Sequence, residues 1–176
     1  LVSSVHLDPN FGDTLNEIKS DGFEVYDEIK IEMENNALSV IPKAIGSGII
    51  SISNTLAKLK PDFVVVYADR FEGLAAVITS TQMNIPTAHV EGGDITEGGA
   101  LDDSVRHAMS KLAHLHYTTN EQATNRILAM GEDPWRVHTV GFPAIDLIKD
   151  GSFENPENIV NKLNINSNLS CLDYFN

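Results

Sequence analysis

The sequence predicts an α/β fold in which helices flank a mostly parallel sheet. Short β-branched or aromatic segments alternate with segments of helical apolar spacing along residues 1–150, a pattern typical of βαβ units. The apolar run 63–67 has the length of a strand, and we expect it to be buried on both faces. Asp69 and Glu91 closely follow two predicted strands, at the sheet edge where ligands bind in this fold class.

The first sixty residues predict two strands and two helices in alternation. Residues 1–6 and 23–26 are predicted strands, residues 11–20 form a short amphipathic helix, and the acidic residues 28–36 form a surface loop. A long helix then begins at Asn36 or Ser39 and runs to about Lys60. Its apolar residues recur at a spacing of three and four, which places them on one face; they are Ile41, Ile45, Ile49, Ile52, Leu56 and Leu59.

The second half continues the alternation. Thr119-x-x-Gln122 forms a capping-box pattern, with Asn120 as a rival cap, and the helix that it opens should end at Gly131. Beyond Asp150 the chain is rich in Asn, so residues 151–176 are predicted to be a linker or the start of a further domain. The other predicted elements are helix 71–83, strand 87–90, helix 102–113, strand 114–118, strand 137–140 and a short helix to Ile148.

Composition limits the classes of function. The 176 residues suffice for one domain with a core. A net charge of −13 argues against nucleic acid and anionic membrane surfaces as partners, and no apolar run approaches the roughly 20 residues of a membrane span. One cysteine excludes an internal disulfide and fits a cytoplasmic location.

Charged residues recur at the predicted carboxyl edge of the sheet. Asp69, Glu91 and Asp102 stand after two strands and at the start of a helix. Taken singly, each could be a helix cap or half of an ion pair. Together they favour a site, because grouped carboxylates repel one another and shift each other's pKa values, which can produce an acid and a base at neutral pH. Arg70 could bind a phosphate or carboxylate, and Arg106 could hold Asp102 from one helical turn away.

Other residues extend this candidate site. Gly92 and Gly93 would let a ligand approach the backbone closely. His6 lies at the end of a predicted strand, and His107 is either part of a surface pair or a substrate contact.

Three other kinds of site are not supported. His89-x-Glu91 lacks the Cys-x-x-Cys half of a zinc-deaminase signature. His114-x-His116 lacks a third metal ligand, so a structural role is favoured. Neither glycine-rich phosphate-binding motif occurs. We therefore expect no metal and no cofactor.

Five motifs in combination resemble the UDP-N-acetylglucosamine 2-epimerases, and most closely their hydrolysing branch, which supplies sialic-acid-type sugar synthesis. The motifs are Pro61-Asp62-Phe63-Val64-Val65-Val66, Asp69-Arg70-Phe71, His89-Val90-Glu91-Gly92-Gly93, Asp102-Asp103-Ser104-Val105-Arg106-His107-Ala108 and Gly141-Phe142-Pro143. The resemblance covers roughly residues 1–150. It implies the N-terminal half of an enzyme of the GT-B type, with two Rossmann-like domains and UDP-N-acetylglucosamine bound between them.

The resemblance also implies a reaction. UDP would leave by anti elimination, and water would then add to give N-acetylmannosamine. Asp69, Glu91 and Asp102 match the acid–base carboxylates, without an assignment of which is the base. The implied substrate contacts are His6, Arg70, Gly92, Gly93, Arg106 and His107.

The resemblance further implies that parts of the enzyme lie outside these 176 residues. A first strand would precede Leu1, and nearly all of the second domain would follow. We therefore expect this chain to be inactive alone, and the full-length protein to be a homo-oligomer. Two other classes remain open: a non-catalytic module that binds a sugar nucleotide, and a GT-B glycosyltransferase that uses a UDP-sugar. The exact N-acyl sugar, including one of a legionaminic-acid-type pathway, is also open.

Overall fold

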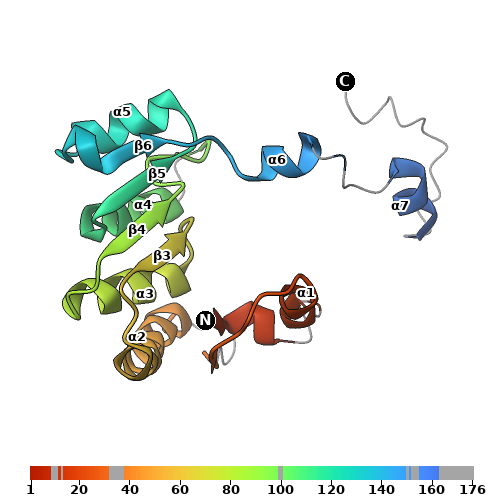
Figure 1. Cartoon of the computed structure of the whole chain (residues 1–176), viewed down its shortest axis with the longest axis horizontal. Helices are drawn as coiled ribbons and strands as arrows, with labels where there is room; N and C mark the ends of the chain where they lie inside the picture. The colour runs from red at the N-terminus through yellow and green to blue at the C-terminus, as the bar shows by residue number, and fades with distance from the viewer. Residues whose placement is uncertain are drawn as a thin grey trace. The chain divides into compact units, whose positions relative to one another are not determined.

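The computed structural model describes residues 1–8, 12, 14–31, 38–98, 101–149, 151 and 155–162. It divides the chain into two compact units, residues 1–141 and 142–176. The first unit contains a four-stranded parallel sheet with the order β3-β4-β5-β6 (Figure 1). The predicted α/β fold with a parallel sheet is thus confirmed. The strands are β3 (Val64–Tyr67), β4 (Thr87–Val90), β5 (Leu115–Thr118) and β6 (Val137–Thr139).

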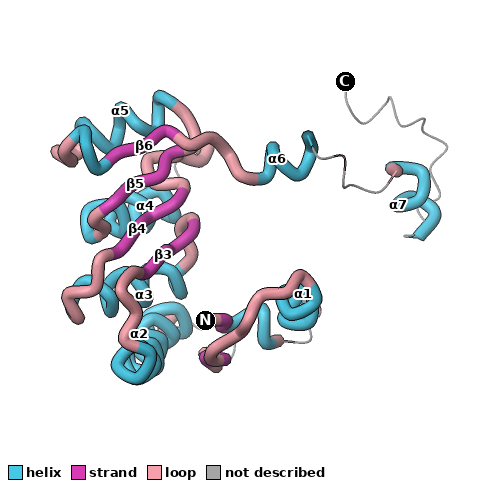
Figure 2. The backbone as a smooth tube through the Cα atoms, in the orientation of Figure 1, coloured by secondary structure: helices cyan, strands magenta, loops and turns pink. Residues whose placement is uncertain are grey.

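Three helices connect these strands and cover one face of the sheet. Because neighbouring strands follow one another in sequence and crossovers are right-handed, every connecting helix falls on the same face. Figure 2 shows the strands as one layer with these helices against it. Val66, Val77 and Met109 form a core cluster between the sheet and the helices. The helices are α3 (Phe71–Gln82), α4 (Leu101–Leu112) and α5 (Glu121–Ala129).

The prediction that residues 63–67 are buried on both faces is wrong. Val66 is 6% exposed and faces the helices, whereas Val65 and Tyr67 are 63% and 54% exposed. Successive side chains of a strand point to opposite faces, so this alternation shows that only one face of β3 is covered within the described part of the chain.

The N-terminal segment forms a separate parallel pair of strands. β1 (Val2–Ser3) pairs with β2 (Glu28–Ile29). The strand predicted at residues 23–26 is therefore displaced, and the surface loop predicted from residue 28 is wrong at its start, where Ile29 is buried. The reason is that pairing with β1 and burial select the strand, while the aromatic residues Phe23 and Tyr26 remain exposed. Residues 32–36 of that loop lie outside the described residues.

The other N-terminal elements are helical. A 3-10 turn, Ser4–Leu7, replaces the second half of the strand predicted at residues 1–6. The helix predicted at residues 11–20 is observed as α1 (Thr14–Ser20). Residues 11 and 13, at the predicted start, lie outside the described residues. The long helix is confirmed as α2 (Val40–Leu59), with Ser39 as its N-cap. Its inward face packs with β2 and α3, and the cluster contains Ile29, Ile31, Ala44, Ile52, Leu56 and Ala75.

A groove separates β1 from β3. It encloses about 470 Å³ and is lined by Leu1 and Ser3 on one side and by Val65 and Tyr67 on the other. The amides of β3 that bond to β4 belong to alternate residues, as Val64 donates to Pro86 and Ala68 donates to Val90. The backbone groups of Val65 and Tyr67 therefore point to the opposite edge, toward the groove.

The remaining helices belong to the second unit. α6 (Ala144–Lys149) matches the short helix predicted to end near Ile148, and α7 (Pro156–Lys162) follows it. Most of the segment predicted to be a linker or further domain lies outside the described residues. Among the described helices, none combines the length and apolar composition that crossing a membrane would require.

Candidate active site

The backbone turns in the same way after β3 and after β4. Ala68 and Glu91 both adopt left-handed conformations, with φ of 60° and 64°. They follow Tyr67 and Val90, which pair in register on neighbouring strands. A residue with a side chain rarely adopts this conformation, and such strain concentrates at functional sites. The two turns place Asp69 and Glu91 at the same edge of the sheet, as the sequence predicted.

An arginine on α4 binds the first of these carboxylates. Arg106 forms an ion pair with Asp69, and its Nη1 lies 3.8 Å from Oδ1 of Asp103. All three side chains are mostly buried, with exposed fractions of 11% for Arg106, 19% for Asp69 and 15% for Asp103. The expected partner of Arg106 was Asp102. That residue is exposed in the first turn of α4, and the helix instead turns Asp103 toward Arg106.

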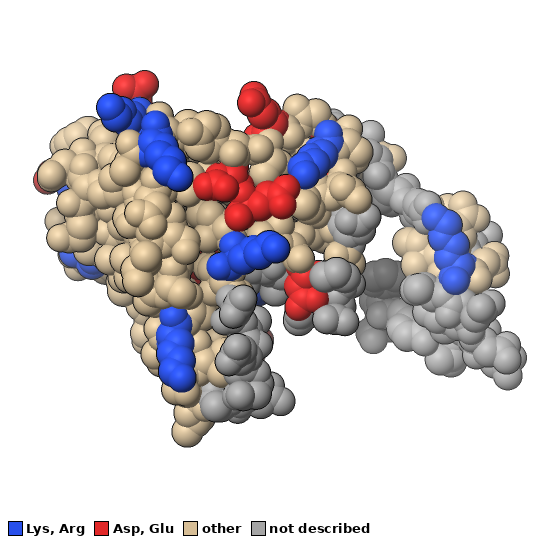
Figure 3. Space-filling view, turned by 90° about the horizontal axis from the view of Figure 1, so that it is seen from below, with Lys and Arg blue, Asp and Glu red and all other residues tan. Residues whose placement is uncertain are grey.

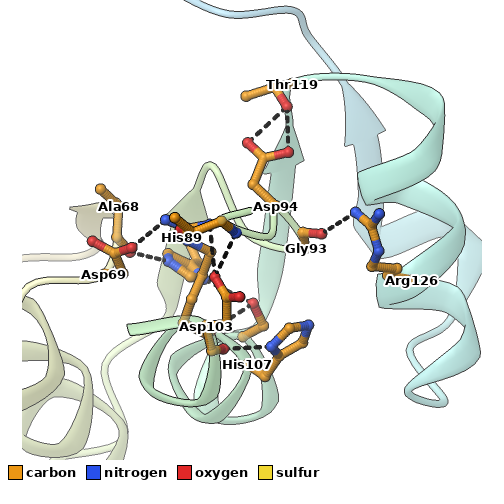
Figure 4. A network of polar contacts seen from close by, with 12 residues as sticks. Ala68, Asp69, His89, Gly93, Asp94, Asp103, His107, Thr119 and Arg126 are labelled. Carbon is orange, nitrogen blue, oxygen red and sulfur yellow. Dashed lines mark hydrogen bonds and ion pairs between the residues drawn. The ribbon is translucent and has the colours of Figure 1, made fainter. Parts of the chain in front are cut away.

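A buried histidine supports the turn that carries Asp69. His89 Nε2 donates to the carbonyl oxygen of Ala68 over 2.7 Å, and its Nδ1 lies 3.0 Å from the hydroxyl of Ser110 (Figure 4). Burial lowers the pKa of His89 to about 4, although the bond to Ala68 opposes this shift. The imidazole is therefore neutral at pH 7 and holds the strained Ala68 peptide in place.

Glu91 is held by a phenol from the neighbouring strand. Tyr67 donates its hydroxyl to Oε1 of Glu91. The hydrogen bond to this carboxylate, followed by desolvation, raises the pKa of Tyr67 to about 12. Tyr67 was not among the residues predicted from the sequence.

The glycines after Glu91 are required by the fold. Gly93 has a φ of 83°, and a Cβ there would overlap the carbonyl oxygen of Ala123. Its own carbonyl accepts from Nη1 of Arg126 over 2.8 Å. A Cβ at Gly92 would lie 2.8 Å from the Ser110 hydroxyl. The groups that closely approach the backbone of these glycines are thus protein atoms, from Ala123 and Ser110. A substrate contact at Gly92 or Gly93 remains a prediction.

A further carboxylate extends this edge. Both oxygens of Asp94 accept from the hydroxyl of Thr119 over 2.8 Å, and Asn120 also donates to it over 3.3 Å. Figure 4 shows Asp94 directed at Thr119, beside Gly93. Asn120 also caps α5 by accepting from the amide of Ala123, so Asn120 and not Thr119 is the N-cap of this helix.

Figure 3 shows Asp and Glu side chains gathered on one face, with Lys and Arg side chains around them.

Three predicted substrate contacts have protein partners. Arg70 forms an ion pair with Glu72 at 3.0 Å, and its guanidinium lies over the ring of Phe71. His6 Nδ1 lies 3.0 Å from the hydroxyl of Thr14. His107 bonds to the backbone carbonyl of Asp103 one turn earlier. Asp69 and Arg106 are in direct contact, whereas among the described residues the side chains of Arg70, His6 and His107 bond to other partners.

His114 and His116 have structural partners. His114 Nδ1 accepts from the amide of Thr87 over 3.1 Å, and the buried His116 lies 3.3 Å from Glu132. Glu132 also pairs with Lys111 and Arg136. Within the described part of the chain, no group of three or more His, Cys, Asp or Glu residues is arranged to hold a metal ion.

The fold and the edge residues define a parallel α/β domain with a carboxylate-rich rim at the carboxyl ends of β3 and β4. The model of the UDP-N-acetylglucosamine 2-epimerase family matches residues 1–172. The chain belongs to this family, as the resemblance predicted.

Two curated relatives are named as hydrolysing epimerases. The UDP-N,N'-diacetylbacillosamine 2-epimerase (hydrolyzing) of Legionella pneumophila is 38% identical over 147 residues, which cover 84% of this chain and 38% of that protein. The GDP/UDP-N,N'-diacetylbacillosamine 2-epimerase (hydrolyzing) of Campylobacter jejuni is 35% identical over 159 residues, which cover 90% of this chain and 41% of that protein. The chain therefore spans about two fifths of the length of these relatives.

A solved structure shares the fold. The crystal structure of UDP-GlcNAc 2-epimerase from Neisseria meningitidis bound to UDP-GlcNAc superimposes with a TM-score of 0.72 at 21% identity. The match covers 93% of this chain and 41% of that chain.

Sequence reasoning does not select three residues of this edge, namely Tyr67, Asp94 and Asp103. Asp103 is adjacent to Asp102, which the sequence pattern favours. The i, i+3 spacing between Asp103 and Arg106 indicates that these two side chains lie on one face of the helix. The apolar pattern identifies Tyr67 only as the end of a strand, although its position before the turn that carries Asp69 indicates that its hydroxyl lies at the rim.

Proposed function

We propose that the full-length protein carrying this chain is a hydrolysing sugar-nucleotide 2-epimerase, which converts UDP-N-acetylglucosamine and water to N-acetylmannosamine and UDP. The observation that carries this proposal is that Asp69 and Glu91 follow the neighbouring strands β3 and β4 at the same edge of the sheet, in a chain of this family. Elimination of UDP needs a base for the C2 proton and an acid at the departing phosphate, and carboxylates in different surroundings can supply both roles.

The surroundings of the carboxylates differ in a way that suits this chemistry. Asp69 is ion-paired with Arg106, whereas Glu91 accepts from the neutral phenol of Tyr67. Asp102 is exposed at the start of α4 and is free of such a partner among the described residues, which leaves it available to a substrate.

The sugar is a separate part of the proposal. The relatives of 38% and 35% identity are named for N,N'-diacetylbacillosamine nucleotides. A UDP-N-acetylglucosamine 2-epimerase of Neisseria meningitidis is 28% identical over 159 residues. We therefore propose UDP-N,N'-diacetylbacillosamine as the alternative substrate, in a legionaminic-acid-type rather than a sialic-acid-type pathway.

The proposal also includes the arrangement of domains in the full-length protein. Residues 1–150 would form the N-terminal Rossmann-like domain, and a second domain would complete the site for UDP. The groove between β1 and β3 supports the expectation of a further strand before Leu1, because it presents strand edges on both sides. The enzyme would be cytoplasmic and homo-oligomeric, and the isolated chain would be inactive.

The experiment is a turnover assay on the full-length protein. Each of the two UDP-sugars is supplied without an acceptor, and released UDP and free sugar are quantified. Release of UDP in equal amount with a free 2-epimeric sugar supports a hydrolysing epimerase and identifies the better substrate. UDP release that requires an added acceptor would instead favour a glycosyltransferase, and binding without turnover would favour a non-catalytic module.

A further inference from the structure

We propose that Tyr67 is a positioning residue for the reaction, which fixes the carboxylate of Glu91 through its phenol hydroxyl. The proposal rests on the proposed function and adds a residue to its machinery. Tyr67 is the last residue of β3 and lies in register with Val90, immediately before Glu91. Its hydroxyl donates to Oε1 of Glu91.

The environment of Glu91 makes this donor important. Glu91 is only 9% exposed, so most of the water that would solvate its carboxylate is excluded. A buried charged group needs hydrogen bonds in exchange for that water. Among the described residues, the side chain that donates a hydrogen bond to this carboxylate is the phenol of Tyr67.

The backbone at Glu91 limits its side chain as well. Its φ of 64° is held by the bond from its amide to the carbonyl oxygen of Tyr117, at 2.9 Å. The strained peptide fixes where the side chain begins, and the phenol fixes where one of its oxygens ends. With Oε1 held on the Tyr67 side, the carboxylate has less freedom to rotate.

The chemistry of Tyr67 suits a fixed donor rather than a proton carrier. Its bond to Glu91 is the main cause that raises its pKa to about 12, so the phenol keeps its proton at neutral pH. Tyr67 is 54% exposed and lines the groove beside β3, so few packing contacts depend on the hydroxyl. Removal of this one oxygen should therefore disturb orientation far more than folding.

The test compares four variants of the full-length protein in the UDP-release assay. Tyr67→Phe should lower kcat by about 10- to 100-fold, the range expected when a reacting group is misplaced, with KM changed by less than about twofold. In a Glu91→Gln background the same substitution should change kcat by less than about twofold, because two residues that act as a unit are not additive. Tyr117→Phe is the matched control: Tyr117 lies on β5, two strands away from Tyr67, where its ring stacks on His138, and the substitution should leave kcat unchanged.

A second measurement follows the contact without turnover. The absorbance of tyrosinate is titrated in the wild type and in Glu91→Gln. One tyrosine that ionises near pH 12 in the wild type should ionise closer to the ordinary value of 10 in the variant.

The outcomes separate this proposal from the proposed function. A wild-type protein that does not release UDP overturns the function itself, and the positioning role with it. A wild-type protein that turns over, combined with a fully active Tyr67→Phe variant, overturns the positioning role alone. The positioning role is also overturned if the losses in kcat from the two single substitutions multiply in the double variant. It is likewise overturned if Glu91→Gln leaves the tyrosine titration unchanged.

Discussion

Arg106 on α4 forms an ion pair with Asp69, which lies 37 positions earlier in the turn after β3. The pair connects a helix to the carboxyl edge of the sheet, and Arg106 also lies near Asp103 on its own helix. Removal of the arginine would leave two largely buried carboxylates without the cation that they share. Removal of Asp69 would leave the arginine with Asp103 as a remaining partner.

Arg106→Met should therefore destabilise the protein more than Asp69→Asn does. Breaking a buried pair by loss of one partner typically costs 3–5 kcal/mol, and we expect roughly 3 kcal/mol here because the pair is not fully buried. Asp69→Asn should cost about half as much. Urea unfolding at neutral pH measures both free energies.

Arg70→Met is the control for this comparison. Arg70 pairs with Glu72 while its side chain is 56% exposed, so its loss should change the free energy of unfolding by less than about 1 kcal/mol. Equal costs for Arg106→Met and Arg70→Met would show that the Asp69 pair is not a structural link between α4 and the sheet.

His89 should make the protein less stable as the pH falls from about 6.5 to about 4. In the folded state its pKa is lowered to about 4, mainly by burial, so the imidazole stays neutral in this window. The unfolded chain takes up a proton near pH 6.5 and gains free energy relative to the folded state. The loss should be on the order of 3 kcal/mol across the window, and unfolding experiments at several pH values would measure it.

His89→Gln should flatten this pH dependence, although it also removes the bond to Ala68 and so lowers stability at pH 7. The buried His116, whose pKa is lowered chiefly by burial, leaves a residual slope of the same sign. His138→Gln, at an exposed position on β6, should keep the full slope. If His89→Gln retained the wild-type slope, the titration would have to come from other groups.

Gly93→Ala should be strongly destabilising. The substitution combines a φ of 83° with overlap between the new Cβ and the carbonyl oxygen of Ala123, so α5 must move. We expect a loss of more than about 2 kcal/mol in thermal or urea unfolding. Gly98→Ala provides the matched control, because its φ of 96° is similar but no atom of the described residues that pack around it lies within 4 Å of the added Cβ. It should cost only about 1 kcal/mol, and similar losses for both variants would refute the packing argument.

Local patterns predicted the second half of the fold well. The strand at residues 87–90 coincides with β4, and the helix at 71–83 differs from α3 by one residue. These elements carry strong apolar periodicity and clear breakers, which act within a few residues. The prediction of the first strands was wrong because strand formation there depends on a pairing partner. Ile29 lies in a strand because it pairs with Ser3 of β1, while the aromatic Phe23 stays exposed.

The candidate site was predictable in its place but not in its contacts. A strand pattern identifies where Asp69 and Glu91 lie, because parallel strands end at one edge. It does not give the rotation of α4, and a shift of one residue turns a side chain by about 100°. The sequence therefore selected Asp102, and the helix directs the adjacent Asp103 toward Arg106.

The edge of β3 that lines the groove gives a final prediction, on hydrogen exchange. The amides of Val65 and Tyr67 point away from β4 and toward the groove, whereas the amide of Val64 donates to Pro86. In this chain the first two amides should exchange rapidly and that of Val64 slowly. If the full-length protein supplies a strand between β1 and β3, both groove-facing amides should become protected by at least about tenfold, as measured by amide exchange in NMR. Slow exchange of Val65 and Tyr67 in the chain alone, or rapid exchange in the full-length protein, would contradict a strand in this groove.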